Sequence, residues 1–148
     1  AWISIRLRFT VIFLFLLSIT SYTFASDPKE IGWDDLIPWT SVFDPSEIEF
    51  NENMNNIDVK IPGYLVPLEF EGQEVHEFLL VPYIGACIHV PPPPPNQIIY
   101  VMTAQPWSSE SMWDPVWVSG IININSQETY LAEVGYELIA YEVEFYDY

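Results

Sequence analysis

Basic residues are nearly absent from this sequence. It contains four lysines and arginines against 21 aspartates and glutamates, which gives a net charge of −17. A surface so poor in cations repels phosphate, which excludes nucleic acid as a partner and disfavours anionic membrane surfaces. Metal cations and basic proteins are the partners that such a field would concentrate. The same charge would also keep a protein soluble outside the cell.

Cysteine is represented by Cys87 alone. One cysteine cannot form a disulfide within the chain, and Cys87 lies too far from the N-terminal segment to carry a lipid anchor there. In an oxidising compartment a lone thiol is buried and inert, bound to a metal, or reactive. The surroundings of Cys87 decide among these three states.

An apolar run from Phe9 to Ile19 follows two arginines and precedes small residues that end at Ala25. This order predicts a secretory signal peptide over residues 1–25, cleaved before Ser26. Even when extended to the end of the following small residues, the run is shorter than the ~18 to 20 apolar residues of a membrane span. We therefore expect an exported chain with no stable membrane insertion after cleavage.

Residues 26–56 are polar, interrupted by glycine and prolines, and predict an irregular arm with short helical turns. One turn is expected around Trp33 to Leu36. A second short helix is expected over Ser46 to Met54, because Ser46 is an N-cap residue with Glu49 three positions on. The remaining residues, 57–148, predict one β domain of ordinary size.

The first strand of this domain changes its apolar parity. Ile57, Val59 and Ile61 alternate with polar residues, and the apolar positions after Pro62-Gly63 have the opposite parity. Such a flip is typical of an extra residue in a strand, so we predict a β-bulge at Pro62-Gly63.

Four further strands are expected over residues 75–81, 98–103, 116–124 and 139–145, since each is short, β-branched and aromatic, with turn residues between them. Residues 129–136 fit a helical turn or a strand equally well. Five strands with a long, bent first strand predict a mainly β fold. We expect a small antiparallel barrel of the oligonucleotide/oligosaccharide-binding (OB) type, and a β-sandwich is the alternative.

One segment has ligands for a transition metal. Cys87 and His89 would project from one face of an extended chain, and His76 lies on the preceding strand. Thiolate and imidazole suit zinc or copper, so Cys87, His89 and His76 form the predicted metal site, with zinc as the ion. The alternatives are a buried structural cysteine and a Cys–His nucleophile. We do not predict an enzyme, because no oxyanion donor or orienting third group can be recognised.

Five consecutive prolines follow this segment and predict a stiff polyproline-II rod of about 15 Å. Such a rod can form the wall of a binding site or dock into an aromatic groove on another protein. Nearby aromatic side chains could stack on sugars or receive a peptide. The predicted interaction surface consists of Pro91, Pro92, Pro93, Pro94, Pro95, Asn96, Gln97, Trp107 and Trp113.

Several segments resemble one bacterial family, the domain of unknown function 3299 (DUF3299). They are Trp33–Pro38, Ile61-Pro62-Gly63-Tyr64, Pro67-Leu68, Glu77–Tyr83, the motif GACIHVPPPPPNQ over residues 85–97, and Pro115–Gly120. The resemblance covers nearly the whole chain after the signal peptide. It implies an exported, periplasmic protein of Gram-negative bacteria with no established activity. It also implies a genetic association with transporter components linked to zinc supply.

Two functions are therefore compatible with the sequence. The first is a periplasmic accessory protein that binds or transfers zinc, with a metal ion or a transporter-associated periplasmic protein as partner. The second is a non-enzymatic OB-like module that binds a protein or glycan through its proline-rich and aromatic surface.

Overall fold

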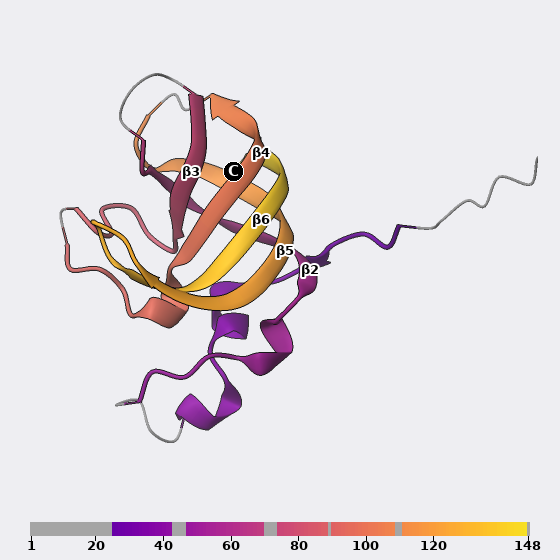
Figure 1. Cartoon of the computed structure of the whole chain (residues 1–148), viewed down its shortest axis with the longest axis vertical. Helices are drawn as coiled ribbons and strands as arrows, with labels where there is room; N and C mark the ends of the chain where they lie inside the picture. The colour runs from indigo at the N-terminus through magenta and orange to yellow at the C-terminus, as the bar shows by residue number, and fades with distance from the viewer. Residues whose placement is uncertain (1–24, 43–46, 70–73, 89, 109–110, 148) are drawn as a thin grey trace, which may run out of the picture.

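The computed structural model describes residues 25–42, 47–69, 74–88, 90–108 and 111–147 (Figure 1). The predicted signal peptide lies outside the described residues, apart from Ala25. Among the residues described, no helix is long and apolar enough to cross a bilayer.

The chain is mainly β, as predicted, and forms one six-stranded sheet. The strands are β1 (Lys29–Glu30), β2 (Ile57–Pro67), β3 (Glu74–Val81), β4 (Ile99–Ser108), β5 (Asp114–Glu128) and β6 (Glu133–Phe145). Their order is β1-β2-β3-β4-β6-β5, and β2 also pairs with β5. The strands β2 to β6 therefore close into a ring of hydrogen bonds, visible in Figure 1 as strands wrapping around one interior.

The ring contains both kinds of strand pairing. The pairs β2–β3, β2–β5, β3–β4 and β5–β6 are antiparallel, whereas β4 and β6 are parallel. This differs from the purely antiparallel expectation. The parallel pair arises because β5 crosses from β4 to β2, so that β6, which returns beside β5, runs in the same direction as β4.

The parity flip in β2 has a cause other than a bulge. Ile57 to Leu65 pair one-to-one with β5 and show no register shift at Pro62-Gly63, so the predicted bulge is wrong. Val59, Ile61 and Leu65 face the inner core, whereas Tyr64 and Val66 pack in a second apolar cluster. The outer face of β2 becomes apolar because a loop covers it from this point onward.

Two apolar clusters hold the molecule together. The inner core fills the ring and includes Phe78, Leu80, Val101, Val118, Tyr136 and Leu138, all fully buried. The outer cluster lies on alternate residues of the same strands. Its buried members are Val66, Leu79, Val81, Ala86, Ile98, Ala132 and Val134. Residues 82–98, named the proline loop below, and the β5–β6 loop contribute to this outer cluster.

The arm contains the strand β1 and the 3₁₀ turns η1 (Trp33–Leu36), η2 (Trp39–Val42) and η3 (Glu52–Met54). The second predicted helix is much shorter than Ser46 to Met54. It is capped by Asn51, whose side chain accepts a hydrogen bond from the Asn53 amide at 3.1 Å, and Ser46 lies outside the described residues.

Buried hydrogen bonds attach the arm to the ring. The hydroxyl of Tyr136 donates to the carbonyl of Leu36 and accepts from the amide of Asn51, both at 2.7 Å. Phe50 packs edge-to-face on Tyr136, with ring centroids 5.6 Å apart. The arm is therefore an integral part of the fold.

Candidate functional site

The predicted metal site lies only partly within the described residues, because His89 is not among them. Cys87 has a φ of 71° and lies in a turn, so the extended conformation assumed for the pair with His89 is absent at this residue. His89 lies outside the described residues. His76 is exposed near the start of β3, about 17 Å along the strand from Val81 at its end. No group of three metal-binding side chains occurs in the described part of the chain. The site stays a prediction that depends on His89.

Cys87 is partly buried, less than the sequence suggested, and packs against the outer cluster. Burial in these apolar surroundings raises the pKa of its thiol. We therefore expect a thiol reagent at pH 8 to label the native protein at least several-fold more slowly than the urea-unfolded chain, as followed by absorbance. Equal rates in the two states would contradict this packing, and Cys87→Ser, which has no thiol, is the blank.

The predicted interaction surface divides into an exposed part and an internal part. Pro91, Pro92 and Pro94 are exposed, whereas Pro93 is buried and Pro95 begins the 3₁₀ turn η4 (Pro95–Gln97). A polyproline-II conformation is observed at Pro94, with φ −62° and ψ 156°.

Asn96 and Gln97 make hydrogen bonds within the chain. The Asn96 side chain donates to the carbonyl of Glu49 at 3.1 Å, and the Gln97 side chain donates to the carbonyl of Trp33 at 3.0 Å. These bonds join the end of the proline loop to the arm. Asn96 and Gln97 therefore have a structural role.

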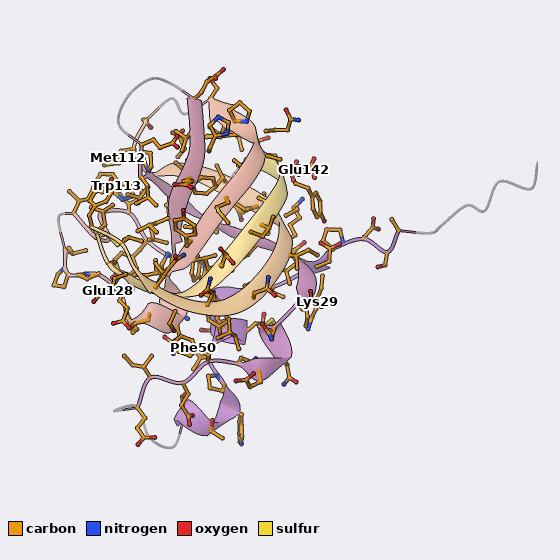
Figure 2. The ribbon with its side chains drawn as sticks, viewed as in Figure 1. Lys29, Phe50, Met112, Trp113, Glu128 and Glu142 are labelled. Carbon is orange, nitrogen blue, oxygen red and sulfur yellow. The ribbon has the colours of Figure 1, made fainter. Side chains whose placement is uncertain are left out.

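The two tryptophans of the predicted interaction surface are half-buried and pack against different clusters. Trp107 packs on the inner core and edge-to-face on Phe145, with centroids 4.8 Å apart. Trp113 packs on the outer cluster, and its backbone N–H donates to the carbonyl of Leu65 at 2.8 Å. Both indoles therefore contribute to packing. Trp113 is one of the side chains labelled in Figure 2.

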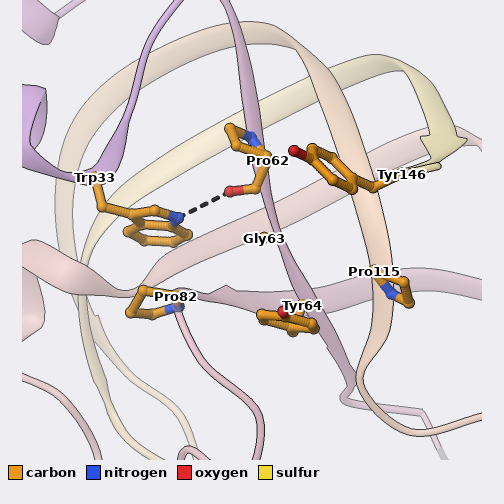
Figure 3. A pocket seen from close by; sticks show the side chains of 7 residues that line it. All are labelled: Trp33, Pro62, Gly63, Tyr64, Pro82, Pro115 and Tyr146. Carbon is orange, nitrogen blue, oxygen red and sulfur yellow. Dashed lines mark hydrogen bonds between the residues drawn. The ribbon is translucent and has the colours of Figure 1, made fainter. Parts of the chain in front are cut away.

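A concave aromatic site lies elsewhere, where the arm meets the ring (Figure 3). Its volume is about 210 Å³ and it is open to solvent. We call it the aromatic pocket. It is lined by Trp33 from η1, Pro62, Gly63 and Tyr64 from β2, Pro82 after β3, Pro115 from β5 and Tyr146 after β6. All seven residues are half-buried, so each is held by the fold and still reachable from solvent.

The walls of the pocket are held in place. The indole N–H of Trp33 donates to the carbonyl of Pro62 at 2.8 Å (Figure 3). A side chain at Gly63 would place its Cβ 3.0 Å from the Trp33 ring and 2.8 Å from Leu80, so this position requires glycine for close packing. At β2 the pocket wall therefore consists of the Gly63 backbone between the side chains of Pro62 and Tyr64.

The opposite wall is fixed by an aromatic stack. Tyr146 stacks on Trp117 with ring centroids 5.2 Å apart, and its amide donates to the carbonyl of Pro115 at 3.0 Å. Lys60 lies 5.2 Å from the Trp117 ring and forms an ion pair with Glu144. These contacts hold Tyr146 at the rim before any ligand arrives.

The aromatic pocket was not predicted, although its residues were visible in the sequence. Six of its seven lining residues lie in segments that carry the family resemblance, and Tyr146 is the exception. The segments are far apart along the chain, and only the closure of the ring brings them together.

The ring and its attached arm define a small, mainly β domain with an aromatic pocket at their junction. The family model described as "Protein of unknown function (DUF3299)" matches residues 39–145, and the chain belongs to this family. No curated protein matches the sequence.

Two solved structures are similar to different degrees. A DUF3299 family protein from Pseudomonas aeruginosa PAO1 is 36% identical, with a TM-score of 0.72 over 83% of this chain and 99% of the other. A chain assigned as an aspartyl-tRNA synthetase from Leishmania major Friedlin is 12% identical, with a TM-score of 0.44 over 86% of this chain and 22% of the other. The second similarity is too low to support any argument about fold or function.

Proposed function

We propose that this protein is an exported, non-enzymatic binding module that holds a proline-bearing, basic-flanked segment of another polypeptide in the aromatic pocket. The observation that carries the proposal is the lining itself. Three aromatic rings and three prolines line a pocket that is open to solvent. Aromatic-lined grooves recognise polyproline-II segments, because these are already extended and lose little entropy on binding.

The size of the pocket favours a short stretch of chain. At about 210 Å³ it is smaller than the ~300 to 1,000 Å³ of sites for drug-sized ligands. One or two residues of a peptide would fill it, with the flanking residues on the surface around it. The charge of −17 would attract basic flanking residues and speed their association.

The polarity of the pocket favours a peptide over a glycan. Among the seven lining residues, hydroxyl groups come from Tyr64 and Tyr146, while proline side chains have no hydrogen-bonding group. The indole N–H of Trp33 already donates to Pro62. A sugar would lose hydrogen bonds to water that this lining replaces poorly, which costs affinity.

We also propose that the ring is an OB-type barrel. A ring of five strands with a long first strand supports this assignment. In such barrels ligands bind on the second and third strands and the adjacent loops. Here the corresponding strands are β3 and β4, and residues of both pack in the outer cluster under the proline loop. The ligand site would accordingly have moved to the first strand, β2.

A labelled peptide with five prolines between arginine pairs provides the test, with binding followed by fluorescence anisotropy. We expect Tyr64→Ala to weaken binding about tenfold, because an aromatic contact contributes about 1.4 kcal/mol. Tyr130→Ala, which removes an exposed tyrosine outside the pocket, is the matched control and should bind normally.

Two further peptides test the requirement for proline and the requirement for positive charge separately. Replacing the prolines by alanine should abolish most binding, and replacing the arginines by glutamate should weaken it most at low salt. Equal affinities for Tyr64→Ala and Tyr130→Ala, or for the proline and alanine peptides, would refute the site.

A further inference from the structure

One row of outward-facing residues crosses all five strands of the ring. Its members are partners in the strand register from β3 through β4, β6 and β5 to β2, and β3, β4, β6 and β5 lie side by side in Figure 1. Residues that are partners in a β-ladder point to the same face of the sheet. We name this set the outer row, and in strand order it consists of Glu77, Met102, Ile139, Ile121 and Asp58.

The middle of the outer row is aliphatic and can be reached from solvent. Ile139 is 44% exposed, Met102 and Ile121 are half-buried on either side of it, and none of the three is part of the inner core or the outer cluster. The preceding residues on β4 and β6, Val101 and Leu138, are fully buried in the inner core. The alternation of the strands therefore fixes the outer row on the outside of the ring.

Carboxylates surround this aliphatic centre. Glu77 and Asp58 form the two ends of the outer row. The next row on one side contains Glu137, and the next row on the other side contains Glu142. Three aliphatic side chains thus lie among four carboxylates on one face of the ring.

Neutral groups orient two of these carboxylates. The Tyr141 hydroxyl donates to Asp58 at 2.7 Å, and the Asn125 side chain donates to Glu137 at 3.4 Å. Partial burial, and after it the hydrogen bond to Asp58, raise the pKa of Tyr141 to about 12, so this hydroxyl is a neutral donor at physiological pH. Such bonds hold the carboxylates in place and leave their charge uncompensated.

The charge of this face selects a basic partner. Lys60 forms its ion pair with Glu144, which is outside the group of four, so the face stays negative. Its field attracts cations and repels anionic lipid and nucleic acid. It also disfavours a second copy of the chain, because two acidic faces would meet. A metal ion needs several ligands close together, and the described residues contain no group of three such side chains.

The strand pairing selects the kind of contact. At Ile139, β6 is paired with β4 on one side and with β5 on the other, so a ligand cannot add a strand there and must contact side chains. Neighbouring strands are about 4.8 Å apart, and successive turns of an α-helix are about 5.4 Å apart. A helix that lies along the outer row would therefore place about one turn over each strand.

We propose that the outer row docks a basic amphipathic helix of another protein, with the apolar side of the helix on Met102, Ile139 and Ile121 and its lysines or arginines at the surrounding carboxylates. Helices with apolar anchors one turn apart are a common mode of recognition. The area is small for a protein interface, so we expect weak, reversible binding. The outer row shares no residue with the aromatic pocket, so either proposal can fail alone.

The test uses a labelled, proline-free helical peptide of leucines and lysines, with binding followed by fluorescence anisotropy. We expect the wild type to bind it and Ile139→Lys to bind about tenfold more weakly, because a like charge would stand in the middle of the row. A peptide with alanine in place of leucine should also bind about tenfold more weakly. Tyr64→Ala, in the aromatic pocket, should bind the leucine–lysine peptide normally.

A pair of charge variants separates a local site from the net charge. Glu77→Gln with Glu137→Gln removes two charges from the face and should weaken binding about tenfold at low salt and less at high salt. The matched control is Glu128→Gln with Glu133→Gln, which removes the same charge at the far end of the β5–β6 ladder. It should bind like the wild type, and circular dichroism should show all variants folded.

Three results would overturn the proposal: no binding by the wild type, equal weakening by the two charge variants, or equal affinities for the leucine and alanine peptides. A dimer in light scattering that Ile139→Lys dissociates would also overturn it, since it would assign the outer row to contacts between copies.

Discussion

Gly120→Ala is expected to destabilise the protein by about 3 kcal/mol or more. A Cβ at this position would overlap the carbonyl oxygen of Ile139 and lie 2.7 Å from the Cα of Ala140. Both atoms are backbone of β6, so neither can rotate away. Relief requires β5 and β6 to separate at this position.

The surroundings explain why the strands approach so closely here. The β5–β6 register shifts between Ser119 and Gly120, because β6 carries one extra residue, Tyr141, at this point. Gly120 also pairs with Val59 of β2, so the position joins three strands. A bulge bends the strand that bears it, and glycine opposite the bend leaves room for the partner backbone.

Urea unfolding followed by circular dichroism measures this effect, and we also expect the melting temperature to fall by about 10 °C or more. Gly32→Ala is the control, because the nearest atom to its Cβ would be 4.0 Å away, on Asp35. That variant should change stability by less than about 0.5 kcal/mol. Alanine lowers the entropy of the unfolded chain equally at both positions, so similar stabilities of the two variants would contradict the clash at Gly120.

The strands of the ring could be predicted from the sequence because each has a regular apolar pattern. β3 contains Phe78 and Leu80 on one face and Leu79 and Val81 on the other, and all four are buried. Periodicity detects such segments whatever they pack against. The element boundaries were less well predicted. β6 begins at Glu133, inside the segment that fitted a turn or a strand equally well.

Periodicity could not show which face of β2 is covered. The flip after Pro62-Gly63 has the same appearance whether the strand contains an extra residue or a loop covers its other face. The covering residues, such as Ala86 and Ile98, come from the proline loop, and their contact with Val66 is a tertiary event. Register shifts occur elsewhere, between Val75 and Glu77 of β3 and between Ser119 and Gly120 of β5.

The aromatic pocket was beyond prediction for a related reason. Trp33 and Pro62 are joined by a hydrogen bond across 29 positions of the chain, and Tyr146 reaches the site only because β6 pairs with β5. No local spacing encodes such a constellation. Cys87 was singled out by the chemistry of its thiol alone, and its packing against the outer cluster could not be read from the sequence.

Tyr136→Phe is expected to lower stability by about 2 kcal/mol and to loosen the arm selectively. The hydroxyl makes two bonds of 2.7 Å, to the carbonyl of Leu36 and from the amide of Asn51, and its side chain is fully buried. Removing it leaves the partly buried amide of Asn51 and the buried carbonyl of Leu36 without this partner, at about 1 kcal/mol for each. The aromatic side chain of Tyr136 stays in the inner core, so the β-strand ring should remain intact.

Hydrogen exchange measured by mass spectrometry separates the two parts of this expectation. Peptides covering residues 31–54 should exchange at least tenfold faster in Tyr136→Phe, while peptides from β5 should change less. Tyr141→Phe is the matched control, because its hydroxyl donates to Asp58 at 2.7 Å on an exposed surface. It should cost less than about 1 kcal/mol and leave the arm protected. Uniform acceleration over the arm and β5 in Tyr136→Phe would mean that arm and ring unfold as one unit. The aromatic pocket, which has Trp33 on the arm and Tyr64 on the ring, could then not open by release of the arm alone.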